Sequence, residues 1–197
     1  RRVLEAMVSR INQTRPDFVV HGGDLVCGGG AFELPWDTYL QSVQDVAEAV
    51  AGFEAPAYYV PGNHDCDAEF KTFAPLAARV PIPEILKVVE VAPRLRLALA
   101  NVYHQMPMET GNGVWTDELD RALRQAAQRA ASDRCALILV LHTWVLPGFV
   151  ADDEDPAGAE IWHSLDLDPV PQQRVRERQL RQVNFLSAWS LDEDSFV

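Results

Sequence analysis

The sequence predicts an α/β fold, a layered sandwich in which helices pack on mixed sheets. Amphipathic helical patterns alternate with short apolar runs along the chain, the order expected of a layered α/β architecture with right-handed crossovers. Three of the apolar runs end in side chains that bind metals or transfer protons. Ligands bind at such carboxyl ends of strands in α/β sheets. A length of 197 residues favours a single domain, 1–197.

The first part of the chain has the pattern helix, strand, helix, strand. Apolar residues at helical spacing predict a helix over 2–13, followed by a strand at 17–20. A second amphipathic helix is predicted over 36–53, and a strand of aromatic and β-branched residues at 58–60. The predicted apolar stripe of the second helix consists of Trp36, Leu40, Val43, Ala47 and Val50.

The second part is less regular at first. Four prolines argue against a long helix in 70–93, and alternation over 95–99 predicts a strand with one face in water. Thr116 is a favourable N-cap for the next helix, and 136–141 resembles a buried strand. The segment 148–197 is expected to form an acidic loop and a charged helix, atypical of the rest. The predicted apolar stripe of the helix after Thr116 is Leu119, Leu123, Ala126 and Ala130.

Composition restricts the partners. A net charge of −12 leaves no basic footprint for nucleic acid and repels a polyanion at long range, so a small molecule is the easier partner. The three cysteines are isolated, which favours a reducing, cytoplasmic compartment. The longest apolar run, 135–141, is too short to cross a membrane. The chain starts at Arg1 within a helical pattern, so we expect the natural N-terminus upstream and keep export as an alternative. The sequence does not define an oligomeric state.

Three predicted strands run into potential ligands. The strand ends are Gly23-Asp24, Gly62-Asn63-His64-Asp65 and His142. Parallel strands would bring these ends together along one edge of a sheet. Carboxylate and amide oxygens combined with imidazole suit Mn, Fe, Zn or Mg better than a thiolate site would.

These motifs, in this order, resemble the calcineurin-like metallophosphoesterases over roughly residues 3–147. The resemblance implies a phosphatase or phosphodiesterase that acts on a small phosphorylated substrate. It further implies a metal-activated water and two divalent or trivalent ions of Mn, Fe or Zn. It implies that Asp24 bridges the two ions, and that Asn63 and His142 bind one of them. It also implies that His64 contacts the phosphate and donates a proton, while Asp65 orients the His64 ring.

Each candidate also has a plainer interpretation. Asp24 alone fits a turn, Asp65 an Asx-turn, and His142 a buried hydrogen-bonded histidine. The combination of motifs favours a functional role for all three. His21, beside the first motif but on the alternate face, is expected to contribute to packing.

Two motifs of the family are not found. No Asp-x-His precedes Asp24, and no Gly-His-x-His follows His142. We therefore expect a fragment, or a chain that has diverged at both ends, with one metal site incomplete and weak hydrolysis. The alternative function is a non-catalytic binding or scaffold module that keeps the fold and has lost part of the metal site.

Overall fold

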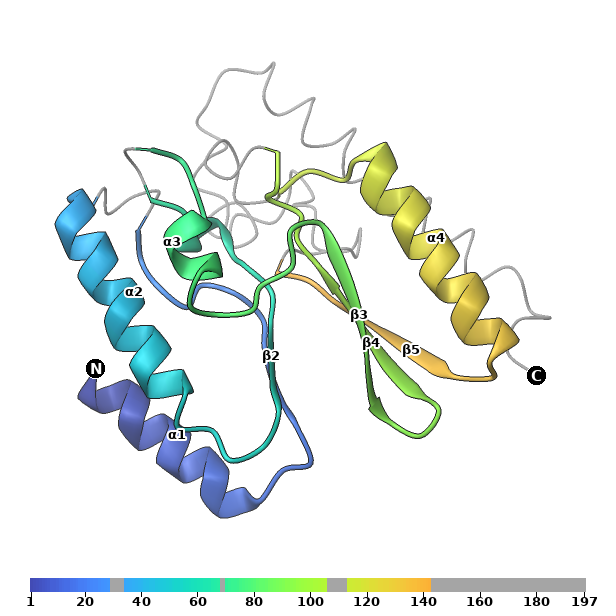
Figure 1. Ribbon diagram of the computed structural model, residues 1–197, viewed down its shortest axis with the longest axis horizontal. Helices are drawn as coiled ribbons and strands as arrows, with labels where there is room; N and C mark the ends of the chain where they lie inside the picture. Colours follow the sequence, from blue (N-terminus) through green and yellow to red (C-terminus); the bar gives the residue numbers. More distant parts are fainter. Residues whose placement is uncertain (29–33, 68–69, 106–112, 143–197) are drawn as a thin grey trace, which may run out of the picture.

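The structure is a computed structural model that describes residues 1–28, 34–67, 70–105 and 113–142. The predicted acidic loop and charged helix of 148–197 lie outside the described residues. Helices and strands alternate along the described chain (Figure 1). The elements are α1 (Arg2–Thr14), β1 (Val19–His21), α2 (Trp36–Val50), β2 (Ala57–Tyr59), the 3-10 turn η2 (Asn63–Asp65), α3 (Ala74–Ala77), β3 (Leu86–Ala92), β4 (Leu95–Ala100), α4 (Asp117–Ser132) and β5 (Ala136–Val140).

The strands of the described residues form two sheets. β1 pairs with β2 in parallel, and the second sheet has the order β3-β4-β5, antiparallel and then parallel. Helices α1 and α2 lie on one side of the strands and α4 on the other (Figure 1). The predicted layered α/β sandwich with mixed sheets is thus confirmed. The expectation of one common sheet edge is wrong, because β5 belongs to a different sheet from β1 and β2.

The two sheets pack against each other through a shared core. Val60, which follows β2, clusters with Leu97 and Leu99 of β4, and each is at most 1% exposed. Phe18 and Val140, beside β1 and in β5, pack on the same cluster. Close packing of apolar side chains fixes the distance between the sheets. The ends of β1, β2 and β5 can therefore meet although the strands do not share a ladder.

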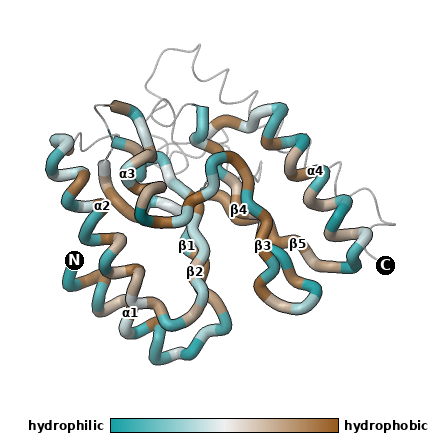
Figure 2. The backbone as a smooth tube through the Cα atoms, viewed as in Figure 1, coloured by the Kyte–Doolittle hydropathy of each residue, from teal (hydrophilic) through white to brown (hydrophobic). Residues whose placement is uncertain are grey.

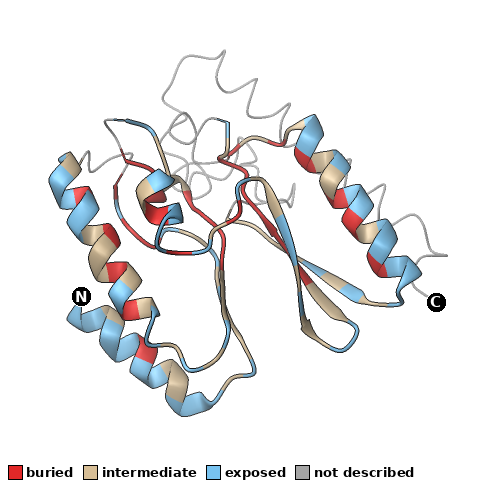
Figure 3. Ribbon diagram, viewed as in Figure 1, coloured by how far each residue is buried: buried red, intermediate tan, exposed pale blue. Residues whose placement is uncertain are grey.

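Strand β4 is buried on both faces. Leu97 and Leu99 contact the other sheet, whereas Ala98 and Ala100 belong to the core beneath α4. Figure 3 shows buried residues along the inner faces of α2 and α4. The predicted water-facing side of this strand is therefore wrong, because the small alanines pack under a helix. The opposite holds for β5, which was expected to be buried: Ile138 is 47% exposed.

The helices follow their predicted patterns to different degrees. In α4 the hydroxyl of Thr116 accepts the Leu119 N–H at 3.2 Å, and the four buried residues are the predicted stripe. In α2 Leu40 is 37% exposed, and the buried face is displaced by about one position from the prediction. That face consists of Tyr39, Val43, Val46 and Ala49. In the tube coloured by hydropathy, hydrophilic and hydrophobic residues alternate along α1, α2 and α4, as expected of amphipathic helices (Figure 2).

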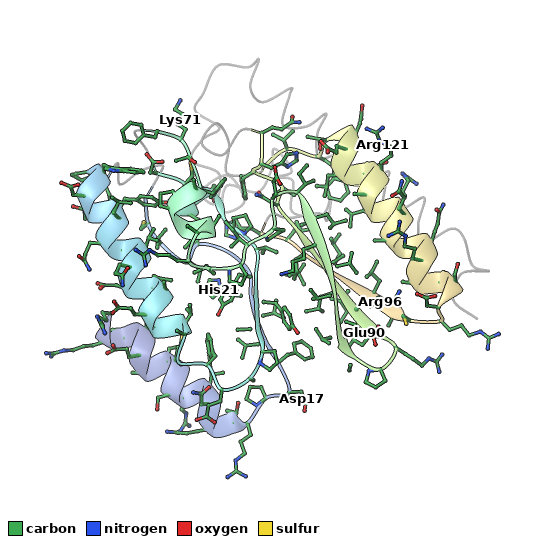
Figure 4. The ribbon with its side chains drawn as sticks, in the orientation of Figure 1. Asp17, His21, Lys71, Glu90, Arg96 and Arg121 are labelled. Atoms are coloured by element: carbon green, nitrogen blue, oxygen red, sulfur yellow. The ribbon has the colours of Figure 1, made fainter. Side chains whose placement is uncertain are left out.

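Strand β3 was not predicted, because prolines surround it. It pairs with β4 and has an irregularity between Glu90 and Ala92. At this end of the sheet Glu90 and Arg96 lie side by side (Figure 4), with 3.5 Å between Oε2 and Nε. Arg96 also pairs with Asp133 at 2.6 Å, which connects the hairpin to the end of α4.

Candidate metal centre

The predicted ligand-bearing segments meet around Asp24. The backbone N–H of His64 donates to Oδ1 of Asp24 at 3.1 Å, and Nε2 of His142 lies 3.4 Å from Oδ2. Asn63 is half-buried and begins the η2 turn, between two residues whose backbones adjoin Asp24. The segments after β1, β2 and β5 thus form one group, as the sequence motifs predicted.

The imidazole of His142 is oriented by the main chain. Its Nδ1 lies 2.8 Å from the carbonyl oxygen of Gly22, which can only accept a hydrogen bond. Nδ1 therefore carries a proton, and Nε2 faces the Asp24 carboxylate. Two lone pairs at this separation repel unless a proton or a cation lies between them. Donation of the other ring N–H to a backbone carbonyl is also the usual arrangement of a metal-binding histidine.

The two side chains shift each other's titration. Burial opposes the charge on His142, but the hydrogen bonds to Asp24 and Gly22 and the charge of Asp24 outweigh it and raise the pKa of His142. Burial likewise favours neutral Asp24, yet His142 and the His64 backbone N–H lower the pKa of Asp24. The pair thus favours a negative carboxylate beside a position for a positive species.

Two glycines, Gly23 and Gly62, allow the segments that follow β1, β2 and β5 to approach each other closely. A Cβ on Gly62 would lie 2.1 Å from Oδ1 and 2.6 Å from the backbone nitrogen of Asp24. A Cβ on Gly23, whose φ is +107°, would lie 2.5 Å from Nδ1 of His142. Asp24 itself has φ 57°, a left-handed conformation that Asp and Asn tolerate better than other residues with side chains. The two glycines of the predicted motifs are therefore required by contact distance.

A family model for calcineurin-like phosphoesterases matches residues 1–142. The chain belongs to the calcineurin-like phosphoesterase family. The match confirms the resemblance predicted from the Gly-Asp and Gly-Asn-His-Asp motifs. No curated protein matches the chain. The family consists of phosphoester hydrolases that generally bind two divalent metal ions.

The donor atoms of this calcineurin-like domain suit such an ion. Two atoms that each lie about 2.1 Å from one metal are separated by about 3 to 3.5 Å, and Asp24 Oδ2 and His142 Nε2 are 3.4 Å apart. The described residues contain no group of three or more His, Cys, Asp and Glu that could hold a metal. The role of Asn63 as a further ligand stays a prediction.

Asp65 makes contacts different from the predicted one. The carboxyl group is fully buried, and its two oxygens accept the backbone N–H groups of Val26 and Gly62, each at 2.8 Å. Burial raises the pKa of Asp65 to about 6, although these hydrogen bonds favour the carboxylate. The side chain thus connects the loop after β1 to the turn after β2. Its orientation of the His64 ring stays a prediction.

Two further residues support the site. The hydroxyl of Tyr39 donates to the backbone carbonyl of Asp65 at 2.8 Å, a contact that was not predicted. The sequence pattern that could have revealed the burial of Tyr39 is its spacing with Val43 and Val46. This spacing fits one face of a helix no less closely than the predicted stripe does. Nδ1 of His21 accepts the Gly23 N–H at 3.2 Å, so this half-buried side chain supports the loop before Asp24.

The helices of the described ranges include none long and apolar enough to span a bilayer.

Proposed function

We propose that the chain hydrolyses the phosphoester bond of a small phosphomonoester or phosphodiester. The observation that carries this proposal is the pair formed by Asp24 Oδ2 and His142 Nε2, 3.4 Å apart, with Nδ1 of His142 committed to the Gly22 carbonyl. This arrangement leaves one imidazole nitrogen and one carboxylate oxygen directed at a single position. A cation there completes the charge balance.

The residues divide into two roles. Asp24, Asn63 and His142 would hold metal ions drawn from Mn, Fe and Zn, and Asp24 would be the ligand that the ions share. His64 lies directly after Asn63 and provides the group that contacts the phosphate and protonates the leaving oxygen. When bound, the ions acidify a water and neutralise phosphate oxygens. Asp65 holds the Asn63–Asp65 turn against the loop that carries Asp24.

Charge supports a small substrate. The chain carries a net charge of −12, which repels a polyanion such as nucleic acid at long range. A small ester experiences less of this repulsion, and bound cations can compensate its negative charge. Monoester and diester would use the same residues, so both belong in the assay.

A second candidate is a non-catalytic binding module. It is favoured because the described ranges contain no group of three or more His, Cys, Asp and Glu arranged to hold a metal ion. One metal site would then be incomplete, and the water would not be activated. This candidate predicts no metal-dependent turnover by the wild-type chain.

The test is hydrolysis of an aryl phosphodiester and an aryl phosphomonoester by the full chain with added Mn²⁺. We expect Mn²⁺-dependent turnover that Asp24→Asn and His64→Ala each reduce by about 10²-fold or more. Asn is the matched replacement, because it tolerates the left-handed backbone at position 24. Asp17→Asn, at an exposed position, is the control and keeps wild-type activity. Undiminished activity in both site variants would refute the assignment.

A further inference from the structure

The hydroxyl of Tyr39 reaches the backbone of the turn that carries Asn63 and His64. Tyr39 lies in α2, is fully buried, and donates to the carbonyl oxygen of Asp65 at 2.8 Å. We propose that Tyr39 is a positioning residue of the phosphoesterase centre, and that its hydroxyl holds the η2 turn in the place where Asn63 and His64 adjoin Asp24. The inference rests on the proposed function, because it concerns the same site.

The turn depends on partners outside itself. A 3-10 helix of three residues is weakly stabilised by its own hydrogen bonds, and the bond from Asp65 N to Gly62 O is long, at 3.3 Å. Donors from outside the turn act on its carbonyl groups. Gly28 N donates to His64 O at 2.7 Å, and Tyr39 Oη donates to Asp65 O. Among the described residues, the hydroxyl therefore acts beside the Gly28 N–H as a hydrogen-bond donor to these carbonyls.

Tyr39 is well placed to act as an anchor because its own ring is fixed. It packs with Val43 and Val46 in the core beneath α2, and against the ring of Trp36 at a centroid distance of 5.7 Å. A Cβ on Gly28 would lie 2.3 Å from the Tyr39 ring, so the Gly28 backbone packs directly against that ring. Burial raises the pKa of Tyr39, which keeps the hydroxyl protonated and able to donate.

The path from the hydroxyl to the ligands is short. The residue that accepts its hydrogen bond, Asp65, also receives the N–H groups of Val26 and Gly62 through its carboxylate. The preceding residue, His64, donates its N–H to Asp24 Oδ1 at 3.1 Å. A turn that moves at Asp65 therefore changes the positions of Asn63 and His64 relative to Asp24.

The experiment compares Tyr39→Phe with Tyr59→Phe in the full chain. Phe keeps the ring and removes only the hydroxyl. Tyr59 is a matched control: it belongs to the same buried cluster, and its hydroxyl has no hydrogen-bond partner in the described part of the chain. Three quantities are measured: Mn²⁺ affinity, amide hydrogen exchange at Gly28 and His64, and kcat with KM at saturating Mn²⁺.

We expect Tyr39→Phe to weaken Mn²⁺ binding about tenfold and to accelerate exchange at Gly28 and His64 about tenfold. We also expect kcat to fall while KM stays within about twofold. Tyr59→Phe keeps wild-type values for all three. A purely structural role would lower the unfolding temperature of Tyr39→Phe and leave Mn²⁺ affinity and kcat unchanged.

The outcomes separate the two proposals. Unchanged amide exchange in Tyr39→Phe overturns the anchoring role, whether or not the wild-type chain hydrolyses esters. If the wild-type chain binds Mn²⁺, an unchanged Mn²⁺ affinity in Tyr39→Phe also overturns the anchoring role. A wild-type chain that neither binds Mn²⁺ nor hydrolyses either ester overturns the proposed function, and amide exchange then decides the role of the hydroxyl alone.

Discussion

A single methyl group at position 62 is expected to abolish the metal centre. In Gly62→Ala the new Cβ would lie 2.1 Å from Oδ1, 2.6 Å from the backbone nitrogen and 2.8 Å from Cγ of Asp24. The carboxylate cannot rotate away without losing the His64 N–H and its position beside His142. We expect Mn²⁺ affinity and hydrolysis to fall by about 10²-fold or more, and the free energy of unfolding to decrease by about 1 to 3 kcal/mol.

Gly22→Ala provides the matched control for stability. A Cβ at Gly22 would meet nothing within 4 Å, although this residue lies in the same loop as Asp24. Urea unfolding of Gly22→Ala should therefore match the wild-type protein. A Gly62→Ala protein that binds Mn²⁺ with wild-type affinity would contradict the contact between Gly62 and Asp24.

Removal of the Asp65 carboxylate is expected to cause the largest loss of stability. In Asp65→Ala the buried N–H groups of Val26 and Gly62 lose their acceptors. Each unsatisfied buried donor costs about 1 to 3 kcal/mol, so the free energy of unfolding should fall by about 2 to 6 kcal/mol. Asp65→Asn should be intermediate, because one amide oxygen can accept while the NH₂ group opposes the other backbone donor.

Urea unfolding of Asp65→Ala, Asp65→Asn and Asp17→Ala measures this effect. Asp17 is exposed, so its substitution should change the unfolding midpoint little. If Asp65→Ala is as stable as Asp17→Ala, the carboxylate does not hold the two loops together. If stability is retained but turnover is lost, the role first predicted, orientation of the His64 ring, becomes the better explanation.

The sequence predicted the buried face of α4 better than that of any other element. The stripe of α4 follows the helical period, and its burial matches the prediction residue by residue. Local patterns failed where tertiary packing determines burial. The alternating sequence pattern of β4 indicated one solvent-exposed face, but Ala98 and Ala100 pack beneath α4. Prolines on either side obscured β3, which is stabilised by pairing with β4.

The candidate site was predictable in its members and less so in their connections. The motifs located Asp24, Asn63, His64 and His142 at the ends of strands, and the structure brings these ends together. The rule that ligands bind at the carboxyl ends of strands does not say which sheet a strand joins. The expectation that all three strand ends share one sheet edge was therefore wrong. The direction of a side chain depends on tertiary contacts. For that reason neither the backbone contacts of Asp65 nor the reach of Tyr39 could be predicted from spacing.

The central claim is that Asp24 and His142, 118 positions apart in the sequence, bind the same cation. A titration with Mn²⁺, followed by electron paramagnetic resonance, should compare the wild-type chain with Asp24→Asn, His142→Ala and the double variant. We expect each single substitution to weaken binding by at least about tenfold, and the double variant to lose far less than the product of the two losses. Wild-type affinity in both single variants, or losses that simply multiply in the double variant, would contradict the account.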